Sequence, residues 1–188
     1  GASGRNAGFS MTKIGMMHSF TATRFGKAKA REAHLYADRA VTLLKGLVED
    51  LDLDCDYEHT GFLWVATSDK YSKRLLKEIA LVHRLGITGV NLIEHEELVG
   101  RVNSPLYRGP AWWEPNTGIL NPAKLSRAWG RVLDEAGVPI YEQTPVTAVE
   151  PGNGRHTVRT PHGSVTARKV ALATNAWTHH FAPMQRKQ

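Results

Sequence analysis

The sequence has little cysteine and no long apolar run. Cys55 is the only cysteine among 188 residues, which excludes an internal disulfide framework and fits a reducing, cytoplasmic location. No apolar stretch approaches the roughly 20 residues that a membrane helix requires. The Walker phosphate loop, the G-x-S-x-G nucleophile motif and the H-E-x-x-H zinc motif are also missing. We therefore expect neither a membrane span nor one of these enzyme classes.

The formal net charge of +6 does not come from one basic patch. Lys and Arg gather loosely in residues 24–31, 70–77 and 155–169. The second of these groups falls on a predicted helix, where solvated basic residues are ordinary. No RRM, KH or helix-turn-helix signature accompanies them. We therefore expect no specific nucleic-acid binding.

The first half of the chain predicts two amphipathic helices separated by a strand. Apolar residues repeat with helical spacing over 28–51, whereas GFLWVAT at 61–67 is dense in the aromatic and β-branched residues typical of strands. Ser68 is suited to cap a second helix, and Gly86 stands where a C-terminal glycine belongs. A short acidic helix is expected at 94–98.

The second half is punctuated by capping residues. Asn121 stands at the N-cap of a predicted helix, Pro122 at its first position and Gly137 just beyond its end. Capping alone explains the Asn-Pro pair. VPIYEQ at 138–143 then predicts a short strand.

Alternating segments follow over residues 144–170. Turn residues divide them into three, which predicts an antiparallel meander. KVALAT at 169–174 is a continuous apolar run, typical of a strand buried on both faces of a parallel sheet. The segment after it would lie at the end of the strand, where α/β sheets bind ligands.

The first nine residues, GASGRNAGF, are mostly small. Such residues add little apolar surface to a core and cost much backbone entropy when they are ordered. Composition alone is compatible with a frayed terminus or with a loop pressed against another group.

Four motifs in order carry a resemblance to a known family. They are SGRNAG at 3–8, NPAKL at 121–125, PVTAVE at 145–150 and ALATNAWT at 171–178. Together they resemble the middle of the FAD-dependent amino-acid and amine oxidoreductases, which include D-amino-acid, glycine and sarcosine oxidases. The first motif resembles a loop of the subgroup similar to gamma-glutamylputrescine oxidoreductase.

The resemblance implies FAD as cofactor and a set of residues that contact or border it. Small residues in the first loop would let the backbone approach the pyrophosphate and flavin, and main-chain N–H groups at a helix start would meet negative charge. Arg5 could instead serve the substrate side or be a solvated loop residue. The implied set is Ser3, Gly4, Arg5, Asn6, Ala7, Gly8, Phe9, Val146, Ala173, Thr174, Asn175 and Trp177.

The resemblance also implies a fold and a domain division. We expect a mixed α/β (α+β) fold: a partial Rossmann-like FAD-binding domain with an antiparallel β-meander, plus part of an α+β substrate-binding domain. Residues 1–56 and 119–188 would belong to the FAD-binding domain and 57–118 to the substrate-binding domain. The G-x-G-x-x-G fingerprint of the family is missing and would lie before Gly1. We therefore expect an internal fragment that binds FAD poorly alone.

The implied chemistry is oxidation of the C–N bond of a small amine or amino acid. Flavin accepts a hydride from carbon, and the resulting imine hydrolyses. We assign no catalytic side chain, and the electron acceptor and oligomeric state are not predicted. Two alternatives stay open: a non-enzymatic basic α/β binding module, and a flavoprotein of the same fold that modifies tRNA or thiazole.

Other conspicuous residues have ordinary explanations. Trp112 and Trp113 predict an aromatic pair on an edge strand, with the wall of a substrate pocket as the alternative. Asp54 and Asp56 beside Cys55 should raise its pKa, which argues against a nucleophilic thiol. The adjacent histidines at 179–180 lack partners at ligand spacing, so we predict no metal.

Overall fold

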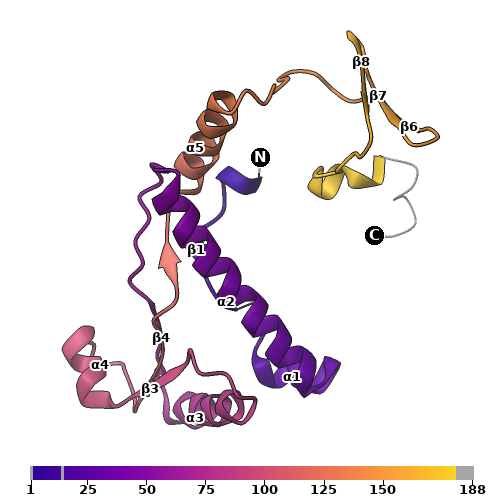
Figure 1. Cartoon of the computed structure of the whole chain (residues 1–188). Coiled ribbons are helices and arrows are strands. Elements are labelled where there is room, and N and C mark those ends of the chain that lie inside the picture. Colours follow the sequence, from indigo (N-terminus) through magenta and orange to yellow (C-terminus); the bar gives the residue numbers. More distant parts are fainter. Residues whose placement is uncertain (1, 14, 181–188) are drawn as a thin grey trace. The chain divides into compact units, whose positions relative to one another are not determined.

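The computed structural model describes residues 2–13 and 15–180. Its contacts divide the chain into a first unit, residues 1–137, and a second unit, residues 138–188. Both units mix short antiparallel strands with helical segments (Figure 1). The predicted mixed class is confirmed, and we describe each unit by itself.

The long helix of the first unit confirms the helix predicted from periodicity. Helix α2 spans Lys27–Asp50 and buries Ala30, His34 and Val41 along one face. The sequence analysis did not predict α1 (His18–Phe25), which packs against α2. Among the described residues, no helix is long and apolar enough to cross a membrane.

Helix α3 (Asp69–Arg84) confirms the second predicted helix. The Ser68 side chain accepts a hydrogen bond from the backbone N–H of Tyr71 at 3.4 Å, and Gly86 ends the turn with φ of 72°. The predicted acidic helix is α4, His95–Arg101. Its first turn carries two glutamates, as the positive end of the helix dipole favours.

The first unit also contains a three-stranded sheet, whose strands alternate with these helices in the sequence. Strand β4 (Ala111–Glu114) is central, with β2 (Phe62–Trp64) and β3 (Asn91–Ile93) antiparallel on its two sides. Strand β2 confirms the predicted strand in shortened form. Trp112 and Trp113 therefore lie in a central strand, and the edge-strand prediction was wrong. The local pattern could not reveal that two distant segments pair with the same short strand.

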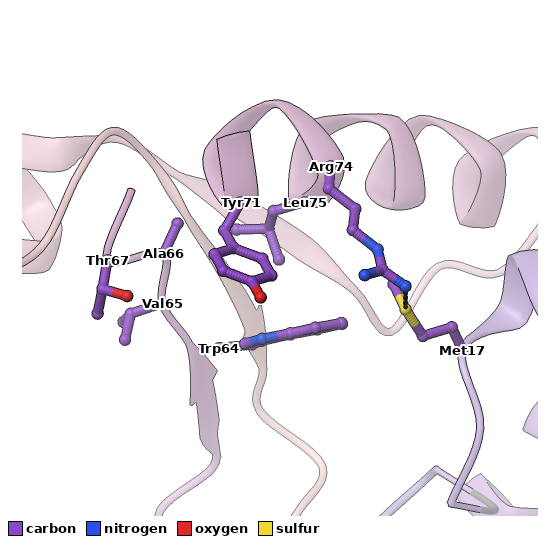
Figure 2. A pocket seen from close by; sticks show the side chains of 8 residues that line it. All are labelled: Met17, Trp64, Val65, Ala66, Thr67, Tyr71, Arg74 and Leu75. Atoms are coloured by element: carbon purple, nitrogen blue, oxygen red, sulfur yellow. Dashed lines mark hydrogen bonds between the residues drawn. The ribbon is translucent and has the colours of Figure 1, made fainter. Parts of the chain in front are cut away.

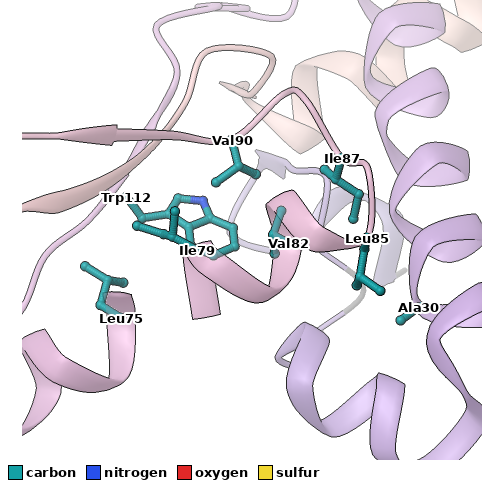
Figure 3. Close-up of a cluster of buried hydrophobic side chains, with 8 residues drawn as sticks. All are labelled: Ala30, Leu75, Ile79, Val82, Leu85, Ile87, Val90 and Trp112. Atoms are coloured by element: carbon teal, nitrogen blue, oxygen red, sulfur yellow. The ribbon is translucent and has the colours of Figure 1, made fainter. Parts of the chain in front are cut away.

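The main hydrophobic core forms where α3 packs under this sheet. The Trp112 side chain is fully buried beside Ile79 and Val90 (Figure 3). Val82 has no exposed surface, and Ala30 joins the cluster from α2. Burial of a side chain as large as Trp112 contributes on the order of 3 kcal/mol, which makes it the anchor of the first unit.

A small two-stranded ladder brings the start of the chain to α5. Strand β1 (Phe9–Ser10) pairs with β5 (Gly118–Ile119), and α5 (Pro122–Glu135) follows directly. The Asn121 side chain accepts from the backbone N–H of Lys124 at 3.1 Å, which confirms the predicted cap. The first residues form a 3₁₀ turn, η1 (Ala2–Gly4), that packs on α5.

The second unit contains the predicted meander. Strands β6 (Ala148–Pro151), β7 (His156–Thr160) and β8 (Gly163–Ala167) pair antiparallel in that order. A 3₁₀ segment, η2 (Asn175–His180), follows after a stretch without regular structure.

Two predicted strands are absent from the described chain. Residues 138–143 and 169–174 adopt no strand, and no described strand pairs with either segment. Ile140 is 54% exposed and Leu172 is 37% exposed. An apolar run becomes a strand only when neighbouring strands pair with its backbone N–H and C=O groups. These two predictions were therefore wrong, because no described strand pairs with either segment.

Candidate functional site

The loop predicted to contact FAD is tied to the N-terminal end of α5. The backbone N–H of Leu120 donates to the Gly8 carbonyl at 2.9 Å. Gly8 has φ of 74°, and a Cβ placed there would lie 2.0 Å from the Leu120 carbonyl oxygen. Only glycine fits this position, because any side chain would push the loop away from α5.

The Asn6 side chain closes the loop on itself. Its Nδ2 donates to the Ser3 carbonyl at 2.9 Å, while its Oδ1 accepts from the backbone N–H of Gly8 at 2.9 Å. The side chains of Ser3, Arg5 and Ala7 are exposed. The loop is thus anchored through Asn6 and Gly8, while its exposed side chains are left for a ligand.

Other predicted contact residues lie beside this loop. Gly4 faces α5, where a Cβ would lie 3.5 Å from the Ser126 hydroxyl oxygen. Phe9 is 63% exposed although it pairs with Ile119 in the β1–β5 ladder. An exposed phenyl ring on a paired strand offers apolar surface to a ligand.

The second predicted set lies in the second unit. Val146 is 42% exposed just before β6, and Trp177 in η2 is 67% exposed. Asn175 has φ of 49°, and the Thr174 hydroxyl hydrogen-bonds to the Thr178 hydroxyl at 2.9 Å. Ala173 is exposed in the preceding segment. Because the two sets lie in separate units, the prediction that they share one cofactor stays a prediction.

The remaining candidates are accounted for separately. The side chains of His179 and His180 lie outside the described residues. Among the residues that are described, no three His, Cys, Asp or Glu side chains are grouped to hold a metal ion. Burial, with Asp54 and Asp56 adding to it, raises the pKa of the Cys55 thiol, as predicted.

Sequence reasoning missed a cluster of buried charged and polar side chains in the first unit. Glu114 on β4 is 1% exposed and accepts hydrogen bonds from the Trp112 Nε1–H at 2.7 Å and from the Thr12 hydroxyl at 2.5 Å. Glu78 on α3 is 3% exposed and accepts from the backbone N–H of Ser19 at 2.9 Å. Buried carboxylates are rare unless they are paired, which marks this cluster as a candidate site.

Two buried histidines join the cluster from α1 and α2. His18 Nε2 lies 3.1 Å from His34 Nδ1, and His18 Nδ1 lies 3.9 Å from a Glu78 oxygen. Burial, with the neighbouring His34 adding to it, lowers the pKa of His18 to about 4. Burial likewise lowers the pKa of His34. Both imidazoles are therefore neutral at pH 7.

Lys13 brings a cationic side chain onto the aromatic residues above this cluster. Its Nζ lies 3.9 Å from the centroid of the Trp64 ring, 4.3 Å from that of Trp112 and 5.3 Å from that of Phe62. Burial lowers the pKa of Lys13 to about 8, although Glu114 and Glu78 oppose the change. An amine that titrates near neutral pH in apolar surroundings is a functional candidate.

Three adjoining cavities run along the chain segment that contains Lys13. The first, about 160 Å³, is bordered by Phe9 and shares Met11 and Phe62 with the second, about 320 Å³. The second also contains Lys13 and shares Met17 and Trp64 with the third, about 240 Å³. This row of cavities therefore begins beside the loop that carries Ser3–Phe9.

The third cavity is walled by aromatic rings and edged by a cation. Tyr71 lies beside Trp64, and the Arg74 side chain reaches Met17 across the opening (Figure 2). Its Nη2 lies 3.0 Å from the Met17 sulfur. A site of this shape, with apolar walls and one cation, suits a small organic molecule with an anionic group.

Comparison with known proteins decides the family. The sequence profile of the FAD dependent oxidoreductase family matches residues 1–188. The chain belongs to this family. It is 28% identical over 181 residues to gamma-glutamylputrescine oxidoreductase of Escherichia coli, and 25% identical over 178 residues to the protein named OrdL of Haemophilus influenzae. Both alignments cover 94% of this chain and 41% of the relative.

A solved structure agrees at the level of fold. Glycine oxidase from Geobacillus kaustophilus superimposes with a TM-score of 0.73 at 21% identity, covering 96% of this chain and 47% of that enzyme. The chain thus spans less than half the length of each relative named here. The resemblance read from the four motifs is confirmed, and FAD is the cofactor of the family.

The described residues fit a flavin cofactor in two respects. The loop at residues 3–9 is anchored through Gly8 and Asn6, so its outer edge is left for a ligand. The first cavity, beside Phe9, is also lined by Met11 and Phe62, and such aromatic and thioether side chains suit an isoalloxazine ring.

Proposed function

We propose that this chain supplies cofactor and substrate contacts in an FAD-dependent oxidoreductase that oxidises the C–N bond of a small amino acid or amine. The family match over the whole chain carries the proposal. The relatives add support, because one is named for oxidation of a glutamylated amine and another for oxidation of glycine. We also propose that residues 1–56 and 119–188 belong to the FAD-binding domain and residues 57–118 to the substrate-binding domain. In this proposal the activity belongs to a longer protein that contains the chain.

In this proposal the anchored loop meets the cofactor. Ser3, Gly4, Asn6, Ala7 and Gly8 offer backbone N–H groups and small side chains to the pyrophosphate side. Packing against the N-terminal end of α5 adds the favourable end of a helix dipole for negative charge. Phe9 would border the flavin ring, because it is exposed at the start of the row of cavities.

The remaining predicted contacts would come from the second unit. Val146 would meet adenine through its backbone, and Ala173, Thr174 and Trp177 would border the cofactor. Asn175 belongs to the same group. The exposed Trp177 ring and the left-handed turn at Asn175 support this part of the proposal.

The row of cavities would receive the substrate. FAD, when bound, accepts a hydride from the carbon next to nitrogen, leaving an imine that water hydrolyses. Phe62, Trp64 and Tyr71 would exclude water and hold the apolar part of the substrate. Arg74 at the edge of the third cavity would attract an anionic group. No side chain is assigned a proton-transfer step.

The visible absorption spectrum of the protein that contains this chain tests the proposal. We expect flavin bands in the purified protein, and we expect them to bleach without oxygen when an amine or amino acid substrate is added. A panel of glycine, sarcosine, D-amino acids and acylated polyamines ranks substrates. A well-folded protein that stays colourless with added FAD would contradict the proposal.

Two glycine variants test the cofactor contacts. Gly8→Ala places a Cβ 2.0 Å from the Leu120 carbonyl oxygen, whereas Gly100→Ala on α4 places its Cβ in open space, outside the proposed site. We expect Gly8→Ala to reduce FAD retention by about tenfold or more, because it displaces the loop from α5 at a cost above about 1.4 kcal/mol. Gly100→Ala is the matched control and should retain the cofactor. Equal FAD retention in both variants would show that the loop does not contribute to the cofactor site.

The alternatives are separated by the same experiment. Family membership favours an oxidoreductase over a basic binding module. A tRNA- or thiazole-modifying flavoprotein would show flavin bands that no free amine or amino acid in the panel bleaches.

A further inference from the structure

The second cavity has an unusual lining, because a lysine side chain lies among apolar side chains. The walls of this cavity contain Lys13, Phe62, Trp64 and three methionines, at positions 11, 16 and 17. The cavity measures about 320 Å³, which is enough for a ring-sized organic molecule. Lys13 is partly buried, and its side chain is among those that line the cavity.

The two nearest carboxylates leave this amine unpaired. Glu114 accepts hydrogen bonds from Trp112 and Thr12, and Glu78 accepts one from the Ser19 backbone. Within the described residues, Lys13 forms no ion pair with either of them, and its closest partners are ring faces. The amine is therefore held by ring faces rather than by a carboxylate, beside the cavity that its side chain lines.

The charges around Lys13 determine how much of it is neutral. Glu114 on β4 and Glu78 on α3 favour the ammonium form, as do the ring faces, whereas His18 on α1 and His34 on α2 are neutral at pH 7 and do not. Burial outweighs the carboxylates and lowers the pKa of Lys13 to about 8. At pH 8 about half of this amine would be neutral, against roughly 0.3% of an ordinary lysine.

We propose that Lys13 is a carbonyl-binding amine that forms an imine with an apolar aldehyde or ketone held in the second cavity. The neutral Nζ attacks the carbonyl carbon and forms a C–N bond. The two amine hydrogens leave with the carbonyl oxygen as water, so no oxidant or reductant is needed. The aromatic and thioether walls select the apolar part of the ligand.

Trapping with benzaldehyde and sodium cyanoborohydride tests this proposal. Hydride from the reductant converts the imine into a stable benzyl amine, and peptide mass spectrometry locates it. The exposed lysines Lys70 and Lys73 on α3 are internal references in the same sample. The protein is used as isolated, with any cofactor bound, and no turnover is required, so the result is independent of the oxidation proposed above.

We expect initial benzylation of Lys13 at pH 8 to exceed that of Lys70 by about tenfold or more, because the excess of neutral amine is partly offset by restricted access. The rate at Lys13 should reach half its maximum near pH 8. Benzyl alcohol, an unreactive ligand of similar shape, should slow Lys13 alone.

Equal rates at Lys13 and Lys70, or no protection by benzyl alcohol, would overturn the proposal. Lys13→Arg should abolish the fast modification and Lys70→Arg should leave it intact. If Lys13→Arg fails to fold, the comparison between lysines within the unaltered chain still decides the question.

Discussion

Glu114 allows the strongest test of the buried cluster. Its two carboxylate oxygens satisfy the Trp112 indole N–H at 2.7 Å and the Thr12 hydroxyl at 2.5 Å, and the residue is 1% exposed. Glu114→Ala removes both acceptors and leaves a buried indole donor without a partner. Glu114→Gln retains one amide oxygen for Trp112 and loses the negative charge.

The geometry gives the size of the effect. Each hydrogen bond to a charged group contributes about 1.5–3 kcal/mol, and part of the loss is offset because the desolvation cost of Glu114 also disappears. We expect Glu114→Ala to lower the free energy of unfolding of the first unit by about 3 kcal/mol and Glu114→Gln by about 1 kcal/mol. For a chain of this length, 3 kcal/mol corresponds to roughly 6–12 °C in Tm.

Urea titration followed by near-UV circular dichroism measures these losses, because the indole rings around Trp112 report on the first unit. Glu150→Ala is the matched control: Glu150 also accepts a 2.6 Å hydrogen bond, from Arg159, but it is exposed and lies in the second unit. We expect that control to leave the transition of the first unit unchanged. A loss below about 1 kcal/mol for Glu114→Ala, or equal losses for both Glu114 variants, would refute the view that Glu114 is held by its two donors.

Two further predictions concern the same unit. The pKa of His18 is about 4 in the folded chain and near 6.5 when unfolded, so the unfolded state binds more protons between these values. The stability contributed by neutral His18 is therefore complete above pH 6.5 and lost as the pH falls toward 4. Urea titrations at pH 7.5, 5.5 and 4.5 should show a shallower pH dependence of the free energy of unfolding for His18→Gln than for the exposed control His162→Gln. Asn121→Ala removes the N-cap of α5 and should cost about 1 kcal/mol in urea unfolding, whereas Ser126→Ala on the exposed face of α5 should cost less; equal costs would contradict the capping role.

The helices of this chain were predictable because their signals are local. The side-chain oxygens of Ser68 and Asn121 cap α3 and α5, because each accepts a hydrogen bond from the backbone N–H three residues later. Gly86 and Gly137 have the positive φ expected after a helix. Such contacts need only the neighbouring sequence. Helix α1 escaped prediction because it is short and its buried residues, His18 and Thr21, are polar.

The candidate site was harder to predict because its contacts join distant segments. Thr12 and Glu114 are 102 residues apart, and Ser19 and Glu78 are 59 apart. A glutamate in a sequence ordinarily indicates an exposed residue, and only the tertiary structure shows which donors surround it. Resemblance to a family pointed to the loop at residues 3–9, but it gave no indication of Lys13.

One signal for the site was nevertheless present in the segment after that loop. Ser10 and Thr12 are buried at 8% and 3% exposure, whereas Phe9, Met11 and Lys13 border the cavities. This is the two-residue alternation of an extended chain, although only residues 9–10 are paired as a strand. The usual direction is reversed: Ser10 and Thr12 face inward, where Glu114 accepts a hydrogen bond from the Thr12 hydroxyl, whereas the apolar Phe9 and Met11 border the cavities together with Lys13. An extended segment that buries its polar face and exposes its apolar face favours a ligand on the apolar side, which supports a cofactor or substrate next to Phe9, Met11 and Lys13.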